Sequence, residues 1–474
     1  MEQSRKVLEK QAVEQFDVHS KEKEYIGLVT GQMRCKKARD MVAKELSDHI
    51  EDQTETYLEF GLSYEDAVAR AVEQMGDPVE VGTAMDRIHR PRVDSRTIGF
   101  IGLLTVFGTL VQILMMQSMI DGAGGAENII GFNSSIFSIC MNSLLGFAVM
   151  LGVMFVDYSF LGKHPVAVWV GLLILLIVYQ VGGFGFRGLN LATTNLSALS
   201  ALMILLFAAI VYAYRNKGYK GILLCLFWLA AGFVMLSRQS GISLAAAVTL
   251  FVTGVMTVSF AVHKGWFAVK RGNAQLLLWG VWLVPLVCMV GALALGLIGE
   301  VYQTARIRHF FDPYKDPQGN GFVVLTMRER LADMKLIGAS TGAEEYYWWY
   351  SLNYVMEKYG VLMGILLLAV LALLFGKMLS GLVKQQNRLG GLLGVSAVSY
   401  LVFSTVLHVM ASLTLIPSTS AYLPFFTEGT NATIGCYLLL GVYLSVHRNT
   451  MILSEKRSEP KRRFRVLVEH VGEE

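Results

Sequence analysis

Long apolar stretches separated by short polar connections dominate the chain after Arg96. A helix needs about 20 apolar residues to cross roughly 30 Å of hydrocarbon, and ten stretches approach that length. Their approximate spans are 97–118, 135–157, 165–183, 196–214, 219–237, 241–262, 275–299, 360–378, 390–416 and 431–447. The pattern predicts an all-α fold, with a ten-helix polytopic membrane domain over 97–448 and a large loop over 300–359.

Residues 1–96 have a different pattern, in which apolar positions recur every three or four residues and no stretch reaches membrane length. Gly61 follows one such stretch, and Ser63 with Asp66 has the spacing of an N-cap and capping box. The predicted helices run from Lys37 to Phe60, from Tyr64 to Met75 and from Pro78 to about His89. We therefore expect a small helical domain over 1–96.

Composition and charge support a membrane protein and give its orientation. The chain is 54% hydrophobic and 16% charged, which is too apolar for an ordinary soluble protein of 474 residues. Lys and Arg occupy every second connection, and such residues are retained on the cytoplasmic side. This places both termini in the cytoplasm of a multi-pass cell-membrane protein and the 300–359 loop outside. The net charge of +4 comes largely from the basic tail, 449–474. This charge is interpreted first as topogenic and second as a contact with anionic membrane lipid, and nucleic acid is not an expected partner.

Cysteine and histidine positions do not indicate a metal site. The five cysteines show neither paired nor ligand spacing, so neither a disulfide nor zinc is expected. His309 and His408 lack a second ligand at helical spacing and are interpreted as packing or interface residues. Nothing before Arg96 has the pattern of a signal peptide, so the first membrane helix is expected to direct insertion.

Three short blocks carry a family resemblance. The first contains Tyr302-Gln303, Arg306-Ile307, Phe311-Asp312-Pro313 and Asp316-Pro317-Gln318-Gly319-Asn320-Gly321-Phe322. The second runs from Pro417 through Thr419, Leu423, Pro424 and Phe425 to Gly429, and the third is Arg187-Gly188-Leu189-Asn190-Leu191. In this order and at these helices, the blocks resemble the SEDS family (shape, elongation, division and sporulation), typified by RodA, FtsW and SpoVE. Separately, Glu45–Ile50, Phe60–Ala67 and Met75–Pro78 resemble the helical permease-prefix (HAAS-type) module, which implies a regulatory or docking role.

The SEDS resemblance implies polymerisation of lipid II, a lipid-linked peptidoglycan precursor, with a partner transpeptidase. The reaction needs a carboxylate to accept a hydroxyl proton and cations to stabilise the leaving diphosphate. The family's Asp lies eight residues before a Glu-Glu-x-Gly segment, which corresponds here to Glu357-Lys358-Tyr359-Gly360, so Trp349 occupies its place. Glu345 and Glu344 are the candidate replacements. The candidate substrate-binding residues are Arg306, Arg308, Asp312, Arg187, Arg328, Pro417, Thr419 and Pro424.

The cations of the outer face have three interpretations. They form salt bridges with Asp312, Asp316, Glu329 and Asp333, or they grip a diphosphate as arginine forks, or they bind a partner membrane protein. A divalent cation is an alternative means of stabilising the diphosphate, and no other cofactor is expected. Two hypotheses for the whole chain follow. One is a glycosyltransferase in cell shape, division or sporulation; the other is a non-catalytic protein that binds or translocates the precursor or scaffolds a partner enzyme.

Overall fold

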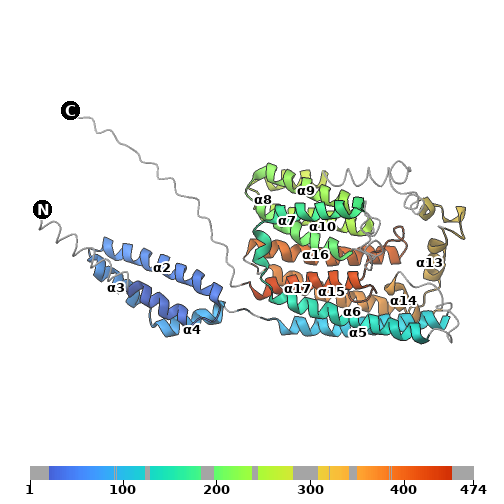
Figure 1. Ribbon diagram of the computed structural model, residues 1–474, viewed down its shortest axis with the longest axis horizontal. Helices are drawn as coiled ribbons and strands as arrows, with labels where there is room; N and C mark the ends of the chain where they lie inside the picture. The colour runs from blue at the N-terminus through green and yellow to red at the C-terminus, as the bar shows by residue number, and fades with distance from the viewer. Residues whose placement is uncertain are drawn as a thin grey trace, which may run out of the picture. The chain divides into compact units, whose positions relative to one another are not determined.

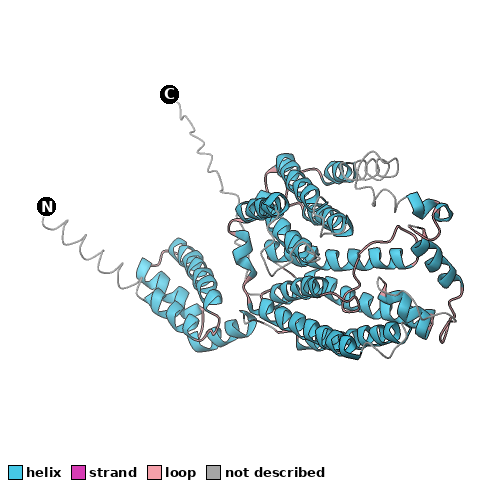
Figure 2. Ribbon diagram, turned by 45° about the vertical axis from the view of Figure 1, so that its right-hand side comes forward, coloured by secondary structure: helices cyan, strands magenta, loops and turns pink. Residues whose placement is uncertain are grey.

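The computed structural model describes residues 21–89, 91, 93–122, 129–182, 197–237, 244–280, 308–319, 321–340, 350–383, 385 and 387–450. The chain forms two compact units, Met1–Pro91 with Asn449–Glu474, and Arg92–Arg448. The described residues are helices joined by loops and turns, with no strand among them (Figure 2). The prediction of an all-α polytopic protein is confirmed.

The first unit is a small helical domain. Its helices α2 (Lys36–Glu59), α3 (Tyr64–Gln74) and α4 (Pro78–His89) agree with the three predicted helices, and residues 21–31 add a helix that was not predicted. Buried residues of that added helix, Tyr25 and Val29, pack with Val42 and Ile50 of α2. Ser63 accepts a hydrogen bond from the Asp66 backbone N–H at 3.2 Å, as the capping-box spacing predicted. The likeness to a permease-prefix module stays a prediction.

The second unit is a bundle of long apolar helices (Figure 1). Its first half comprises α5 (Ser95–Gly122), α6 (Ile129–Phe155), η1 (Tyr158–Gly162), α7 (Pro165–Gly182), α8 (Ser197–Tyr214), α9 (Gly218–Ser237) and α10 (Leu244–His263). Its second half comprises η2 (Pro313–Lys315), α13 (Phe322–Ala332), α14 (Ser351–Tyr359), α15 (Val361–Val383), α16 (Arg388–Ser412) and α17 (Thr430–Arg448). Among the described residues, six helices are long and apolar enough to cross a membrane, and parts of α7 and α8 are shorter apolar helices.

The helix boundaries depart from the predicted spans in several places, among them the ends of α5 and α15, which lie four and five residues beyond the predicted 118 and 378. Helix α6 begins at Ile129, before the predicted 135, because polar residues such as Asn133 and Ser134 continue the helix. Helix α16 ends at Ser412 instead of 416, and the 300–359 loop contains the helices η2, α13 and α14. The seventh predicted span, 275–299, lies outside the described residues after position 280.

The centre of the bundle is formed by α8 and by much of α16. All residues from 203 to 211 of α8 are buried, which is expected of a helix that is apolar on every side. Buried hydroxyls join the central helices: Thr257 of α10 hydrogen-bonds Ser396 of α16 at 2.9 Å, and Ser200 of α8 hydrogen-bonds Tyr400 of α16. Such contacts satisfy polar groups that hydrocarbon cannot solvate, so they fix how the helices pair.

Two glycines bring α17 close to its neighbours. A Cβ on Gly441 would lie 2.8 Å from the Met150 carbonyl oxygen of α6, and a Cβ on Gly435 would lie 3.2 Å from the Ala198 Cα of α8. Small residues let helix backbones approach closely in membrane proteins. Helix α17 is therefore held against both α6 and α8, and this fixes the segment that precedes it.

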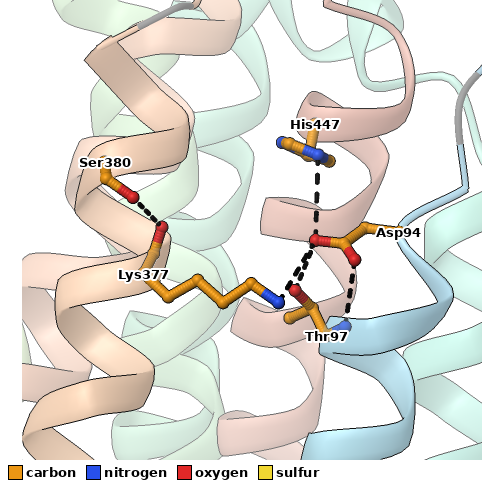
Figure 3. Close-up of polar contacts among 5 residues, drawn as sticks. All are labelled: Asp94, Thr97, Lys377, Ser380 and His447. Atoms are coloured by element: carbon orange, nitrogen blue, oxygen red, sulfur yellow. Dashed lines mark hydrogen bonds and ion pairs between the residues drawn. The ribbon is translucent and has the colours of Figure 1, made fainter.

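The start of α5 is anchored by Asp94, at what we call the linker end of the bundle (Figure 3). Asp94 accepts hydrogen bonds from the Thr97 backbone N–H, at 3.0 Å, and from the Thr97 hydroxyl. Its carboxylate lies 3.7 Å from Lys377 Nζ of α15 and 4.0 Å from His447 Nε2 of α17. Asp94 thus serves as an N-cap and an ion-pair partner at once, and it ties three helices together.

Candidate functional site

The site lies at the opposite end of the bundle, which we call the loop end and define by residues 308–340 and 350–360. In Figure 1, α13 and α14 lie at this end, far from the start of α5. The Asp-Pro-x-Gly-x-Gly motif forms a turn here, because the backbone N–H groups of Gly319 and Gly321 both donate to the Asp316 carbonyl, at 3.3 and 3.0 Å. A Cβ on Gly321 would lie 2.1 Å from the Pro313 carbonyl oxygen, so only glycine fits. The turn leads directly into α13.

The described candidate cations of this region are exposed. Arg328 donates to the Phe310 carbonyl at 3.4 Å, and its guanidinium lies 5.6 Å from the centre of the Phe310 ring. Arg308 and Asp312 are exposed on the same 308–332 segment. The candidates Arg187, Arg306, Glu344 and Glu345, together with Trp349, lie outside the described residues.

A buried ion pair connects α13 to α14. Arg330 Nη1 lies 3.8 Å from Glu357 Oε1, and the two side chains are 20% and 3% exposed. Glu357 Oε2 has no hydrogen-bond partner among the described residues. Burial raises the pKa of Glu357 above its usual value, and the nearby Arg330 charge offsets only part of that effect. Sequence reasoning used Glu357 only to align the Glu-Glu-x-Gly segment and assigned it no role. The apolar residues around it, such as Val355 and Met356, were the signal in the sequence that could have indicated its burial.

The segment 335–340 packs against the end of α14 and the start of α15 through its backbone. Ser340 N–H donates to the Glu357 carbonyl at 2.9 Å, and Val361 N–H donates to the Lys335 carbonyl at 3.0 Å. Between them, Gly360 has a φ of +99°, and a Cβ there would lie 2.7 Å from the Ile337 Cα. Gly360 therefore allows this close approach, which closes the loop end over the start of α15.

The Pro417–Phe425 block is a non-helical segment that lies inside the bundle. Residues 421–426 are all buried, and Phe425 has a left-handed φ of +71°. Gln112 of α5 donates to the Phe425 carbonyl at 2.8 Å, and a Cβ on Gly108 would lie only 2.3 Å from that oxygen. Buried backbone inside a membrane protein needs such partners, because hydrocarbon supplies none. The segment is thus held in place by α5 on one side.

The loop end and this segment meet at Tyr350. The Thr419 backbone N–H donates to the Tyr350 hydroxyl at 3.0 Å, and that hydroxyl donates to the Thr419 carbonyl at 3.3 Å. Asn353 of α14 donates to the Ser412 carbonyl at the end of α16, at 3.1 Å. The structure therefore joins Thr419 to the start of α14, with Pro417 and Pro424 on the same segment, whereas Arg308 and Arg328 belong to the separate 308–332 segment.

A small pocket adjoins the segment on the side of α5, α6 and α17. Its lining includes Gln112, Ser143, Tyr422, Thr427, Cys436 and Tyr437. The Tyr437 hydroxyl donates to Thr105 at 2.6 Å, and Thr109 donates to Ser143 at 2.8 Å. The pocket is therefore polar although it lies among membrane helices.

Comparisons with known proteins agree with this architecture. The sequence profile of the FtsW/RodA/SpoVE family, described as cell cycle proteins, matches residues 95–452. The probable peptidoglycan glycosyltransferase FtsW of Synechocystis sp. is 25% identical over 192 residues, which cover 36% of this chain and 49% of that protein. The protein of the same name from Geobacter sulfurreducens is 21% identical over 324 residues, or 64% of this chain and 83% of that protein.

One solved structure shares the fold. A chain in a peptidoglycan synthase complex that coordinates polymerization and crosslinking aligns with a TM-score of 0.55 and 20% identity, covering 76% of this chain and 98% of that chain. The resemblance inferred from the three sequence blocks is confirmed, since the matched residues include all of them. The chain belongs to the FtsW/RodA/SpoVE family of cell cycle proteins.

Proposed function

We propose that this protein handles a lipid-linked peptidoglycan precursor as a glycosyltransferase at the outer face of the cytoplasmic membrane. Membership of the family supports this, as do relatives named probable peptidoglycan glycosyltransferases. The observation that carries the proposal is the hydrogen-bonded 417–425 segment, whose residues 421–425 are buried and which is joined through Tyr350 to α14. These hydrogen bonds hold the Leu423-Pro424-Phe425 block next to the loop end, and the substrate would bind at this end of the bundle.

The orientation rests on the charges of the connections. Lys and Arg flank the linker end of the bundle, which supports a cytoplasmic position for both termini and for the first unit. The loop end then faces outside, where the sugars of a translocated precursor are. This orientation places the basic tail against the inner leaflet.

The proposed reaction joins two precursor molecules. A sugar hydroxyl oxygen of the acceptor forms a bond to the anomeric carbon of the donor, while the bond from that carbon to the diphosphate oxygen breaks. The hydroxyl proton passes to a carboxylate, for which Glu345 or Glu344 is proposed, and the electron pair leaves with the lipid diphosphate. Arg306, Arg308, Arg187 and Arg328 would stabilise the diphosphate charge.

A second candidate function is non-catalytic. Trp349 stands in the place of the family's proton acceptor, and an indole cannot accept a proton. The buried Glu357 is paired with Arg330, and its backbone carbonyl accepts a hydrogen bond from Ser340, which suits a structural role. In this case the chain binds or translocates the precursor, or scaffolds a partner transpeptidase, under control of the first unit.

A lipid II polymerisation assay on the purified protein separates the two functions. We expect polymer from the wild type, and loss of polymer in either Glu344→Gln or Glu345→Gln. Glu329→Gln, which changes an exposed carboxylate on α13, is the matched control and should retain activity. A wild type that binds lipid II but forms no polymer would support the non-catalytic function.

A further inference from the structure

The 417–425 segment, buried at residues 421–425, receives hydrogen bonds from α16 as well as from α5. Ser404 donates to the Tyr422 carbonyl at 2.9 Å, and His408 Nδ1 lies 2.9 Å from the Ala421 carbonyl oxygen. A carbonyl oxygen can only accept, so His408 Nδ1 is the donor and this bond fixes the tautomer of the neutral ring. His408 thus satisfies a backbone group at the centre of the segment.

His408 also contacts the residue that joins the segment to α14. Its ring lies edge to face with the Tyr350 ring, with centroids 5.5 Å apart at an angle of 70°. Both side chains are buried, His408 at 0% exposure and Tyr350 at 4%. Because Tyr350 bonds both the N–H and the carbonyl of Thr419, the two side chains together hold positions 419 and 421.

We propose that Tyr350 and His408 are positioning residues, which set the 417–425 segment against α14 and so shape the surface that binds the precursor. This rests on the proposed function, because it takes Pro417, Thr419 and Pro424 as substrate-binding residues. The hydrogen bond from His408 Nδ1 to the Ala421 carbonyl is what holds the segment, and another side chain with a donor at this point can replace it. An asparagine places its Nδ2 donor at nearly the same point, whereas an alanine supplies none.

The experiment measures the segment and the ligand separately. A nitroxide label on Ser420→Cys, an exposed position beside Thr419, reports motion of the segment when Cys35, Cys140 and Cys288 are replaced by serine. Lipid II is the probe for binding. We expect His408→Ala to mobilise the label and to weaken lipid II binding about fivefold, the loss typical of one hydrogen bond.

Three variants make the result specific. His408→Asn should restore both the label spectrum and binding to wild-type values. Tyr350→Phe keeps the ring contact but removes the bonds to Thr419, so we expect an intermediate loss, and it remains informative if His408→Ala does not fold. His263→Asn, at an exposed position on α10, is the control and should change nothing.

The positioning role is overturned if the label in His408→Ala and Tyr350→Phe moves as in the wild type. It is equally overturned if His408→Asn behaves like His408→Ala, because the donor would then not be the acting feature. A wild type that does not bind lipid II contradicts the proposed function instead, while the label still tests whether the two residues hold the segment.

Discussion

The two ends of the membrane bundle each hold a carboxylate beside a basic side chain, yet the pKa values of the two carboxyls are shifted in opposite directions. At the loop end, Glu357 is 3% exposed with one guanidinium at 3.8 Å, and burial raises its pKa. At the linker end, Asp94 is 23% exposed. There, burial also acts to raise the pKa, but the Thr97 hydrogen bonds and the charges of Lys377 and His447 outweigh it and hold the pKa below its usual value.

The difference shows that hydrogen bonds and solvent decide the state of a carboxylate more than the presence of a cation does. Glu357 Oε2 has no hydrogen-bond partner among the described residues, so desolvation of its charge is poorly compensated. Asp94 caps a helix, and the partial positive charge of the helix N-terminus adds to that of Lys377 and, when it is protonated, of His447. Helix α15 connects these regions, since Val361 and Lys377 lie roughly 24 Å apart along it. The lowered pKa of Asp94 thus reflects hydrogen bonds and charges that outweigh its burial, whereas the raised pKa of Glu357 reflects a burial that Arg330 only partly offsets.

Removal of Arg330 tests this comparison most strongly. Arg330→Met leaves the Glu357 carboxylate buried without a counter-charge, and we expect it to lower the free energy of unfolding by about 3 kcal/mol. The measurement is denaturant unfolding of the detergent-solubilised protein. Lys358→Met removes a neighbouring exposed cation of α14 and should cost less than about 0.5 kcal/mol.

The double variant Arg330→Met with Glu357→Gln gives the internal check. It should recover most of the loss, because no charge then remains buried. If the double variant is as unstable as Arg330→Met alone, the loss comes from packing of the arginine side chain and not from the unpaired carboxylate.

The packing of the 335–340 segment against Gly360 is tested by Gly360→Ala. The new Cβ would lie 2.7 Å from both the Ile337 Cα and the Leu336 carbonyl oxygen, at a φ of +99° that side chains rarely adopt. We expect a loss of about 2 kcal/mol in the same unfolding measurement, since backbone atoms must shift. Gly376→Ala, also at α15 but with nothing within 4 Å of the new Cβ, should be neutral or slightly stabilising. Equal stability of the two variants would contradict the placement of 335–340.

The sequence predicted the elements of the bundle better than the contacts between them. Apolar stretches located α9 and α10 to within three residues and α5 and α15 to within five, because bilayer thickness sets the length of a membrane helix. The predicted end of α16, at 416, lies four residues beyond the observed end at Ser412. Leu413, Leu415 and Ile416 are apolar, and apolar residues are compatible both with a longer helix and with a turn into the bundle. Thr414, with a φ of +52°, makes that turn, and its residue type does not indicate it.

The candidate site was predicted in part. The Pro417–Phe425 block was identified from its order and spacing, and it is the segment that the structure fixes in the bundle. The pairing of Arg330 with Glu357 could not be predicted, because it depends on how two helices from one polar loop pack together. His408 was interpreted as a packing residue, and its hydrogen bond to Ala421 became visible only once the segment had a position. The roles assigned to Glu344, Glu345 and Arg306 stay predictions.

The smallest expected effect is a difference in pH dependence between the two ends. The raised pKa of folded Glu357 means that its ionisation costs stability as the pH rises from the unfolded value, 4.5, through the folded pKa. The lowered pKa of folded Asp94 means the reverse: its contribution is present above the unfolded value, 3.8, and is lost as the pH falls through the folded pKa. Glu357→Gln should therefore gain stability relative to the wild type as the pH is raised from 4 to 8. Asp94→Asn, which keeps the cap but not the charge, should lose stability relative to the wild type mainly as the pH is raised through the folded pKa of Asp94 toward 3.8. Melting temperatures measured from about pH 3 to pH 8 should shift by about 1–2 °C in opposite directions for the two variants, and parallel curves would mean that the two pKa values are not shifted in opposite directions.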